Sequence, residues 1–472
     1  MRVREVVRMG VCLVAALWVA PWLSAQAKHG SSAAADPPVA GADAKVLARA
    51  LQAYDERKDA EAEPALRELA ARYPRNYVIS EALGSLYAGA GELSQALPLL
   101  ERARRLRPQE AIARANLGAA YLKLNRPGEA VAELQAAARV DPRNADTEAA
   151  LGQALLQQNE PGKAMEALTL ANSLRPDDPE LKYNLAIAQL GAGRIRQAEA
   201  TVGKIPSAAV TDQVQSLAGD IHERLGNYTQ AVLDYQAAAR MNPSDANLFA
   251  VTAELLRHWT WDEAIAMARY GETRYPGSTH FRMAEGIGLY ASGKYAQAAP
   301  VFSSLLAAEP DNGTFADLLG RSCSLVEEGV SAECEGLEAF ARKHTENAQA
   351  ATYAAAALLH RPAEHQNTEQ AELFLRQAIA ADPKLPEAYF ELGVLEQGRL
   401  QWKESASSLE RAIALRPAYT EAHYRLSRAY SHMGRREDAQ REIVLQQRYS
   451  QQEKDSLNTR LQEVVKFIVK PS

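Results

Sequence analysis

Prolines recur in this chain at a nearly fixed interval. Within each run, neighbouring members are 33 or 34 residues apart, and the runs are Pro74, Pro108, Pro142 and Pro176, then Pro243, Pro276 and Pro310, then Pro383 and Pro417. A period of this size is typical of a stacked array of one supersecondary unit. It favours a long binding surface over a catalytic pocket.

Small residues keep the same register as the prolines. A small residue lies 24 positions before most of the prolines, and another follows 12 positions later, as in Gly118 with Ala130 and Gly152 with Ala164. Two helices approach closely only where neither carries bulk, so we expect each pair to mark the crossing point of a helical hairpin. We expect further glycines to form the bend between the two helices: Gly91, Gly128, Gly162, Gly193, Gly226 and Gly293.

The local chemistry also predicts helices. Alanine, leucine, glutamate, glutamine and arginine are abundant, and all favour helix formation. Each recurring proline stands where a helical pattern ends, because it lacks an N–H and clashes with the preceding turn. Asn144, Asp178 and Asp245 follow two residues later as expected N-caps of the next helix.

The residues of one repeat resemble a known family. Asn116, Leu117, Gly118 and Tyr121, followed by Ala130 and Pro142 in the same spacing, resemble the tetratricopeptide repeat. The resemblance implies an all-α, right-handed superhelical solenoid of antiparallel helix hairpins, with about twelve repeats over residues 43–453. Residues near Pro206 shorten one repeat, and residues 360–368 lengthen another.

Both ends of the chain depart from the repeat. Residues 1–27 begin with basic residues, continue with an apolar stretch and end with a small-x-small cleavage site, a pattern that predicts a signal peptide. The alternative is an uncleaved signal anchor in the inner membrane. Residues 28–42 are expected to form a flexible leader. At the other end, a stripe of Leu457, Leu461, Val464 and Ile468 predicts a capping helix over residues 454–472.

Charge and motifs exclude several functions. The 53 basic and 59 acidic residues give a net charge of −6 without a basic stripe, so nucleic acid is not an expected ligand. The sequence has no HExxH, CxxC, Walker or GxSxG motif. His360 and His365 are five residues apart, which does not place two metal ligands on one helical face. We therefore expect no enzymatic activity, no cofactor and no metal.

Two cysteines remain beyond the predicted signal peptide. Cys323 and Cys334 are expected on the two helices of one hairpin. In an oxidising compartment they can form a disulfide. The alternative is that both are small apolar core residues, since Cys323 stands where other repeats have tyrosine.

Candidate binding residues follow from the family resemblance. In such repeats the first helix of each hairpin lines a concave groove, and the residue two before the small crossing residue points into it. Asn116 and Asn184 occupy that position, with Gln153 and Tyr183 close by. An amide can donate to and accept from an extended peptide backbone. Asparagine is also common on helix surfaces, which is the alternative interpretation.

Trp259 is a second candidate. It stands where other repeats have a turn glycine and is either an exposed interface anchor or part of a hairpin cap.

These patterns predict a protein that binds a protein or peptide partner. We expect a non-enzymatic scaffold in a bacterial periplasm or envelope, or secreted, that holds an extended or helical segment in its groove. It would meet a membrane only through partners or an uncleaved signal anchor. The alternative is an accessory subunit of an envelope polysaccharide-synthesis, secretion or glycosyltransferase complex.

Overall fold

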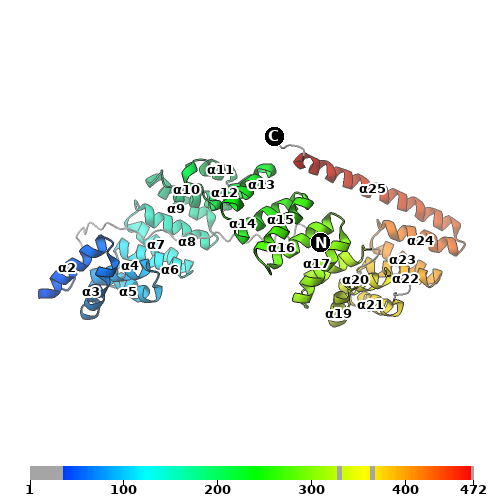
Figure 1. Cartoon of the computed structure of the whole chain (residues 1–472), viewed down its shortest axis with the longest axis horizontal. Helices are drawn as coiled ribbons and strands as arrows, with labels where there is room; N and C mark the ends of the chain where they lie inside the picture. Colours follow the sequence, from blue (N-terminus) through cyan, green and yellow to red (C-terminus); the bar gives the residue numbers. More distant parts are fainter. Residues whose placement is uncertain (1–35, 327–331, 362–366, 469–472) are drawn as a thin grey trace. The chain divides into compact units, whose positions relative to one another are not determined.

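The chain folds into a series of helix hairpins (Figure 1). The structure, a computed structural model, describes residues 36–326, 332–361 and 367–468, with side chains as far as residue 452. The predicted signal peptide, residues 1–27, and the first part of the predicted leader lie outside these residues. The described part contains 24 α-helices and no strand, which agrees with an all-α solenoid of about twelve hairpins.

The described residues form two compact units that divide between Asn227 and Tyr228. The N-terminal unit holds eleven α-helices: α2 (Gly41–Asp55), α3 (Asp59–Arg72), α4 (Tyr77–Gly89), α5 (Leu93–Leu106), α6 (Ala111–Lys123), α7 (Pro127–Val140), α8 (Ala145–Gln157), α9 (Pro161–Leu174), α10 (Pro179–Gly191), α11 (Ile195–Val202) and α12 (Asp212–Leu225). A short 3-10 helix, η1 (Ser207–Ala209), precedes α12. It lies beside Pro206, where the sequence predicts a shortened repeat.

The C-terminal unit begins with α13 and continues in hairpins. Its helices are α13 (Tyr228–Met241), α14 (Asp245–Arg257), α15 (Trp261–Arg274), α16 (Thr279–Ala291), α17 (Tyr295–Ala308), α18 (Gly313–Cys323), α19 (Glu335–Lys343), α20 (Ala348–Leu359), α21 (Thr368–Ala381), α22 (Pro386–Gly398), α23 (Trp402–Leu415), α24 (Thr420–His432) and α25 (Arg436–Ile468).

Within each unit, the first helices of neighbouring hairpins contact one another. In the N-terminal unit, α4, α6, α8, α10 and α12 form such a row, and in the C-terminal unit α18, α20, α22 and α24 do so. Second helices mainly contact the helix before and the helix after them. The row of first helices therefore presents one continuous face in each unit, on which side chains from successive hairpins lie next to one another.

Glycine at the hairpin crossing is required by close packing. A Cβ atom on Gly118 would lie 2.6 Å from Cγ of Leu134, and one on Gly152 would lie 2.4 Å from Cγ of Leu168. Ala130, on the second helix of the same hairpin, is fully buried. The crossing points predicted at Gly118 and Gly152 are confirmed, because at both positions a side chain larger than hydrogen would displace a leucine of the second helix.

The bend between the helices of a hairpin uses one left-handed residue. Gly91, Gly193, Gly226 and Gly293 have φ between 74° and 81°, as predicted. The prediction for Gly128 and Gly162 is wrong, because both belong to the first turn of a second helix. Their bends place asparagine in the left-handed region instead, with φ of 54° at Asn125 and 58° at Asn159. Asparagine tolerates this conformation better than most residues, which explains the exchange.

Helix N-caps are mostly as expected. The Asn144 side chain accepts a hydrogen bond from the N–H of Thr147, and Asp178 accepts from two backbone N–H groups. Asp245 is not a cap. It is the first residue of α14, and Ser244 before it accepts the hydrogen bond from the backbone of Asn247.

The two ends of the array differ from the predicted boundaries. The first helix begins at Gly41, and Asp36 pairs with Arg107 at 3.0 Å and accepts a hydrogen bond from the N–H of Val78, so this end of the predicted leader contacts the array. At the C-terminus, α25 continues without a break to Ile468, so residues 454–468 prolong the last repeat helix instead of forming a separate one. Neither glycine nor proline occurs between Arg436 and Ile468 to end the helix earlier.

Among the residues that the structure describes, no helix has the length and apolar character needed to span a membrane.

Candidate functional site: the first-helix face and a cleft in the C-terminal unit

Asn116 lies on α6, and its side chain forms hydrogen bonds within the array. Its side chain is only 3% exposed, and Nδ2 donates to Oε1 of Glu81 at 2.7 Å and to Oγ of Ser85 at 2.9 Å. Both partners belong to α4, the first helix of the preceding hairpin. The amide therefore joins two first helices, and its donor atom is already used within the array.

The other predicted groove residues lie on the next two first helices. Gln153 on α8 and Asn184 on α10 are 6% and 8% exposed, and Tyr183 is half-buried beside the cluster around Ala186. Burial raises the pKa of Tyr183 to about 12. The four residues thus lie on three neighbouring hairpins, largely buried. Their role in partner binding stays a prediction.

Trp259 lies at the bend between α14 and α15. Its φ of 66° places a large residue in the left-handed region that most other bends give to glycine or asparagine. The side chain is 38% exposed, and its ring stacks on that of Trp261 with centroids 6.3 Å apart. Trp259 is therefore partly accessible and partly packed, and its role as an interface anchor stays a prediction.

Cys323 and Cys334 are joined by a disulfide. Their Cα atoms are 6.1 Å apart, and both residues are almost fully buried. The expectation that both cysteines lie on helices is wrong for Cys334, which precedes α19 as its N-cap residue. The disulfide therefore connects the end of α18 to the start of α19 and closes the segment between them. It fixes the distance between two helices that are shorter than their equivalents in most other repeats.

The groove position carries different chemistry in the C-terminal unit. Two residues before the small residues Ala355, Gly393 and Ser427 stand Tyr353, Glu391 and Arg425, on α20, α22 and α24. Sequence reasoning missed these three. The spacing from the recurring prolines that selects Asn116 and Asn184 also selects Glu391 and Arg425, whereas Tyr353 belongs to the lengthened repeat, in which that count fails.

Glu391 is an unusual carboxyl group. Its Oε2 atom is buried and has no hydrogen-bond partner among the described residues. Burial raises the pKa of Glu391 to about 7, although nearby Arg425 partly opposes the rise. Near neutral pH, a large share of the Glu391 side chains is therefore protonated. Glu391 consequently neutralises Arg425 less than an ordinary glutamate would.

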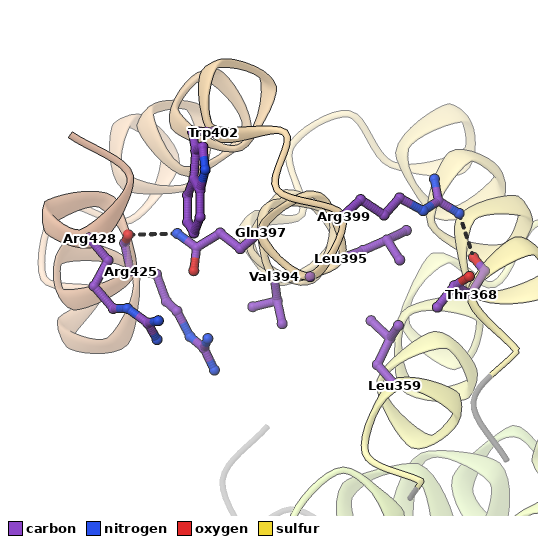
Figure 2. Close-up of a pocket in the computed structure, with 10 residues that line it drawn as sticks. Leu359, Thr368, Val394, Leu395, Gln397, Arg399, Trp402, Arg425 and Arg428 are labelled. Carbon is purple, nitrogen blue, oxygen red and sulfur yellow. Dashed lines mark hydrogen bonds between the residues drawn. The ribbon is translucent and has the colours of Figure 1, made fainter. Parts of the chain in front are cut away.

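Next to this row lies a cleft of about 320 Å³ (Figure 2). It is formed by the end of α20, the start of α21, the C-terminal half of α22 with the following bend, and α24. Figure 2 shows Arg425 and Arg428 on one side of the opening and Leu359 on the other, with Val394 between them. The lining residues are Leu359, Thr368, Val394, Leu395, Gln397, Gly398, Arg399, Trp402, Arg425 and Arg428.

The side-chain amide of Gln397 uses its nitrogen, but not its oxygen, in a hydrogen bond to a described residue. Its Nε2 donates to the carbonyl oxygen of Arg425 at 2.7 Å, which fixes the orientation of the amide. The residue is 5% exposed, and its buried Oε1 has no hydrogen-bond partner in the described part of the chain. The cleft therefore contains a buried acceptor without a donor.

The two arginines of α24 form no direct ion pair with a described residue, although Glu391 lies near enough to Arg425 for an electrostatic interaction. No ion pair or side-chain hydrogen bond joins the guanidinium of Arg425 or Arg428 to any residue described by the structure. Neighbouring arginines behave differently, because Arg399 pairs with Glu372 and Arg416 pairs with Glu387. The cleft thus combines unpaired positive charge, a free acceptor and the aliphatic side chains of Leu359 and Val394. This combination is suited to binding, since its lining includes no histidine, cysteine or carboxylate.

Family models of the tetratricopeptide repeat match most of the hairpins. One model matches residues 87–154, 121–180, 155–221 and 394–455, and a second matches residues 216–279 and 283–323. Together they cover more than half of the chain. No curated protein matches the sequence significantly.

Several solved structures resemble the chain at low identity. A tetratricopeptide repeat protein from Parabacteroides merdae ATCC 43184 is 14% identical, with 52% of this chain and 98% of that chain covered and a TM-score of 0.40. Pseudomonas aeruginosa pilF is 23% identical, with 44% and 95% covered and a TM-score of 0.37. YrrB, described as having an unusual peptide-binding site, is 20% identical, with 40% and 97% covered and a TM-score of 0.36.

Proposed function

The chain belongs to the tetratricopeptide repeat family, and on that premise we propose that it is an exported, non-enzymatic scaffold that holds a segment of a partner protein. The observation that carries the proposal is the cleft at α20–α24. It places two arginines that form no ion pair with a described residue beside the side chains of Leu359 and Val394. Such a cleft is suited to binding a segment of another protein.

The partner segment binds along the first helices of the C-terminal unit. Tyr353, Glu391 and Arg425 occupy equivalent positions on three successive first helices, and of these three Arg425 lines the cleft. In the N-terminal unit the equivalent Asn116 is 3% exposed and bonded internally. Partner selection therefore depends more on the C-terminal unit.

The site of action is the bacterial periplasm or envelope. The signal-peptide pattern of residues 1–27 motivates this proposal, and the buried Cys323–Cys334 disulfide supports it, since structural disulfides persist mainly in oxidising compartments. If the partner proves to be a component of a polysaccharide-synthesis or secretion complex, the protein is an accessory subunit of that complex.

Site-specific crosslinking in the native host tests the binding face. A photo-crosslinking amino acid replaces Val394 in the cleft, and Leu373 on α21, which is 62% exposed, serves as the control position. We expect a discrete adduct at position 394, in the periplasmic or envelope fraction, that is absent at position 373. The proposal is wrong if both positions give the same adducts, or if neither gives one above background.

A further inference from the structure

Resting on the proposed function, we propose that the cleft at α20–α24 binds a carboxylate side chain within a continuous partner segment, next to an aliphatic residue of that segment. Three independent features of the cleft indicate this ligand chemistry: the arginine pair, the free acceptor of Gln397 and the aliphatic wall.

The arginine pair provides the charge complementarity. Arg425 and Arg428 are three residues apart on α24, so both side chains leave the same face of the helix. Figure 2 shows their guanidinium groups on the same side of the cleft. Neither makes an ion pair with a described residue, whereas Arg399 at the opposite end is already paired with Glu372. An incoming carboxylate can accept charge-assisted hydrogen bonds from both.

Gln397 favours a ligand that carries a hydrogen-bond donor. Its Oε1 is buried without a donor in the described structure, while its Nε2 is held by the carbonyl of Arg425. Leaving a buried acceptor unsatisfied is unfavourable, so a ligand whose N–H group reaches this atom gains affinity. A peptide backbone supplies that N–H within the same segment as the carboxylate. Hydrogen phosphate can donate an O–H to the same atom, so inorganic phosphate is included as a competitor in the test.

The opposite wall selects an aliphatic neighbour. Leu359 on α20 lies on the side of the cleft away from the arginines, and Val394 on α22 lies between Leu359 and the arginines. Their apolar surface favours an aliphatic side chain over a second charge, since burying an unpaired charge there is unfavourable. The preferred sequence therefore contains one acidic residue and one aliphatic residue close together.

Glu391 is compatible with an acidic ligand. It is the carboxyl group that acts on Arg425, and burial raises the pKa of Glu391 to about 7. When protonated, Glu391 does not repel the incoming carboxylate.

An array of octapeptides, acetylated at the N-terminus and amidated at the C-terminus, tests the proposal with the purified chain. Three further sets are added: the same peptides with glutamine for glutamate, with phosphoserine for glutamate, and with a free C-terminal carboxylate. We expect the blocked peptides that carry one acidic and one aliphatic residue to be selected. Selected peptides are then measured in solution by fluorescence polarisation, with inorganic phosphate as competitor.

Charge-matched variants identify the residues. We expect Arg425→Gln with Arg428→Gln to weaken the binding of the selected peptides by about tenfold or more, since both charge-assisted hydrogen bonds to the carboxylate are lost. The control is Arg436→Gln with Arg448→Gln, two exposed arginines of α25 that do not line the cleft. This pair makes the same change in net charge and is expected to leave affinity within about twofold.

Several outcomes would overturn the inference. The inference is wrong if glutamate and glutamine peptides bind equally, or if only phosphopeptides or only peptides with a free C-terminus are selected. It is also wrong if the Arg425→Gln, Arg428→Gln variant still prefers acidic peptides. Crosslinking separates this inference from the proposed function. If the adduct at position 394 persists while the array shows no acidic preference, the scaffold function stands and the ligand chemistry is wrong.

Discussion

Backbone strain in this array is concentrated at the left-handed residue found in the bend of most of the described hairpins. Glycine accepts that conformation without cost, whereas Trp259 and Leu400 adopt it with φ of 66° and 60°. Leu400 is 70% exposed, so packing of its side chain offsets little of the strain. It lies between Arg399 and Trp402, both of which line the cleft. The two large residues therefore stand at bends where the fold itself favours glycine.

Glu391 predicts a pH dependence of stability. Its pKa is about 7 in the folded chain, above its ordinary value of 4.5, because burial disfavours the charged form. Between these two values the unfolded chain has already lost the proton that the folded chain retains, so stability falls as pH rises and stays reduced above pH 7. One pKa unit corresponds to about 1.4 kcal/mol, which gives a penalty of roughly 3 kcal/mol at alkaline pH.

Replacing Glu391 by glutamine removes that penalty. We expect the Glu391→Gln variant to equal the natural chain in stability near pH 4.5 and to exceed it increasingly up to pH 8. Urea unfolding followed by tryptophan fluorescence measures the difference, because Trp402 lies on the adjoining helix α23. A constant difference between the two proteins from pH 5 to pH 8 would contradict the assigned pKa shift.

At the scale of the hairpin, two glycines in consecutive helices have opposite roles. Gly152 lies at the crossing of α8 and α9, where a Cβ atom would lie 2.4 Å from Leu168, whereas a Cβ on Gly162 in α9 would have no neighbour within 4 Å. We expect Gly152→Ala to destabilise the N-terminal unit by roughly 1–3 kcal/mol through overpacking. Gly162→Ala should stabilise it by up to about 1 kcal/mol. Urea unfolding followed by circular dichroism compares them, and equal effects would exclude crossing contacts as the cause.

The sequence predicts these elements well because their constraints are local and repeated. Prolines at helix ends, glycines at crossings and N-caps such as Asn144 each act within one hairpin, so a single period identifies them all. The sequence analysis places the bend at Gly128 instead of Asn125, because glycine is the residue most typical of a left-handed bend. Gly128 actually follows Pro127 inside α7. Proline at the first helical position marks the helix start and would have corrected the assignment.

The candidate site was only partly predictable. The register gives the groove positions, but it does not show that Asn116 is bonded to Glu81 and Ser85 of the preceding hairpin. Such contacts depend on how successive hairpins pack, which the sequence of one repeat does not determine. The same applies to Gln397, whose free acceptor arises only because its donor is taken by the backbone of α24. The cleft is thus a property of three hairpins together.

At the scale of the whole molecule, the division into two units makes their unfolding separable. Repeat arrays are stabilised by intrinsic hairpin stability and by contacts between neighbours, so distant parts need not unfold together. The tryptophans provide a selective probe. Trp259, Trp261 and Trp402 all belong to the C-terminal unit, and the other two, Trp18 and Trp22, fall within the predicted signal peptide. In the chain from Lys28 onward, fluorescence therefore reports only the C-terminal unit, while far-UV circular dichroism reports both.

Matched glycine substitutions distinguish independent unfolding from a single transition. Gly152 in the N-terminal unit and Gly393 in the C-terminal unit occupy the same repeat position, and a Cβ atom on Gly393 would lie 2.7 Å from Leu409. We expect Gly152→Ala to shift the early part of the dichroism curve and leave the fluorescence midpoint unchanged, because its strain is confined to the N-terminal unit. Gly393→Ala should lower the fluorescence midpoint. If each substitution instead shifts both signals by the same amount, the two units unfold as one cooperative structure, and contacts between adjacent hairpins propagate through the entire array.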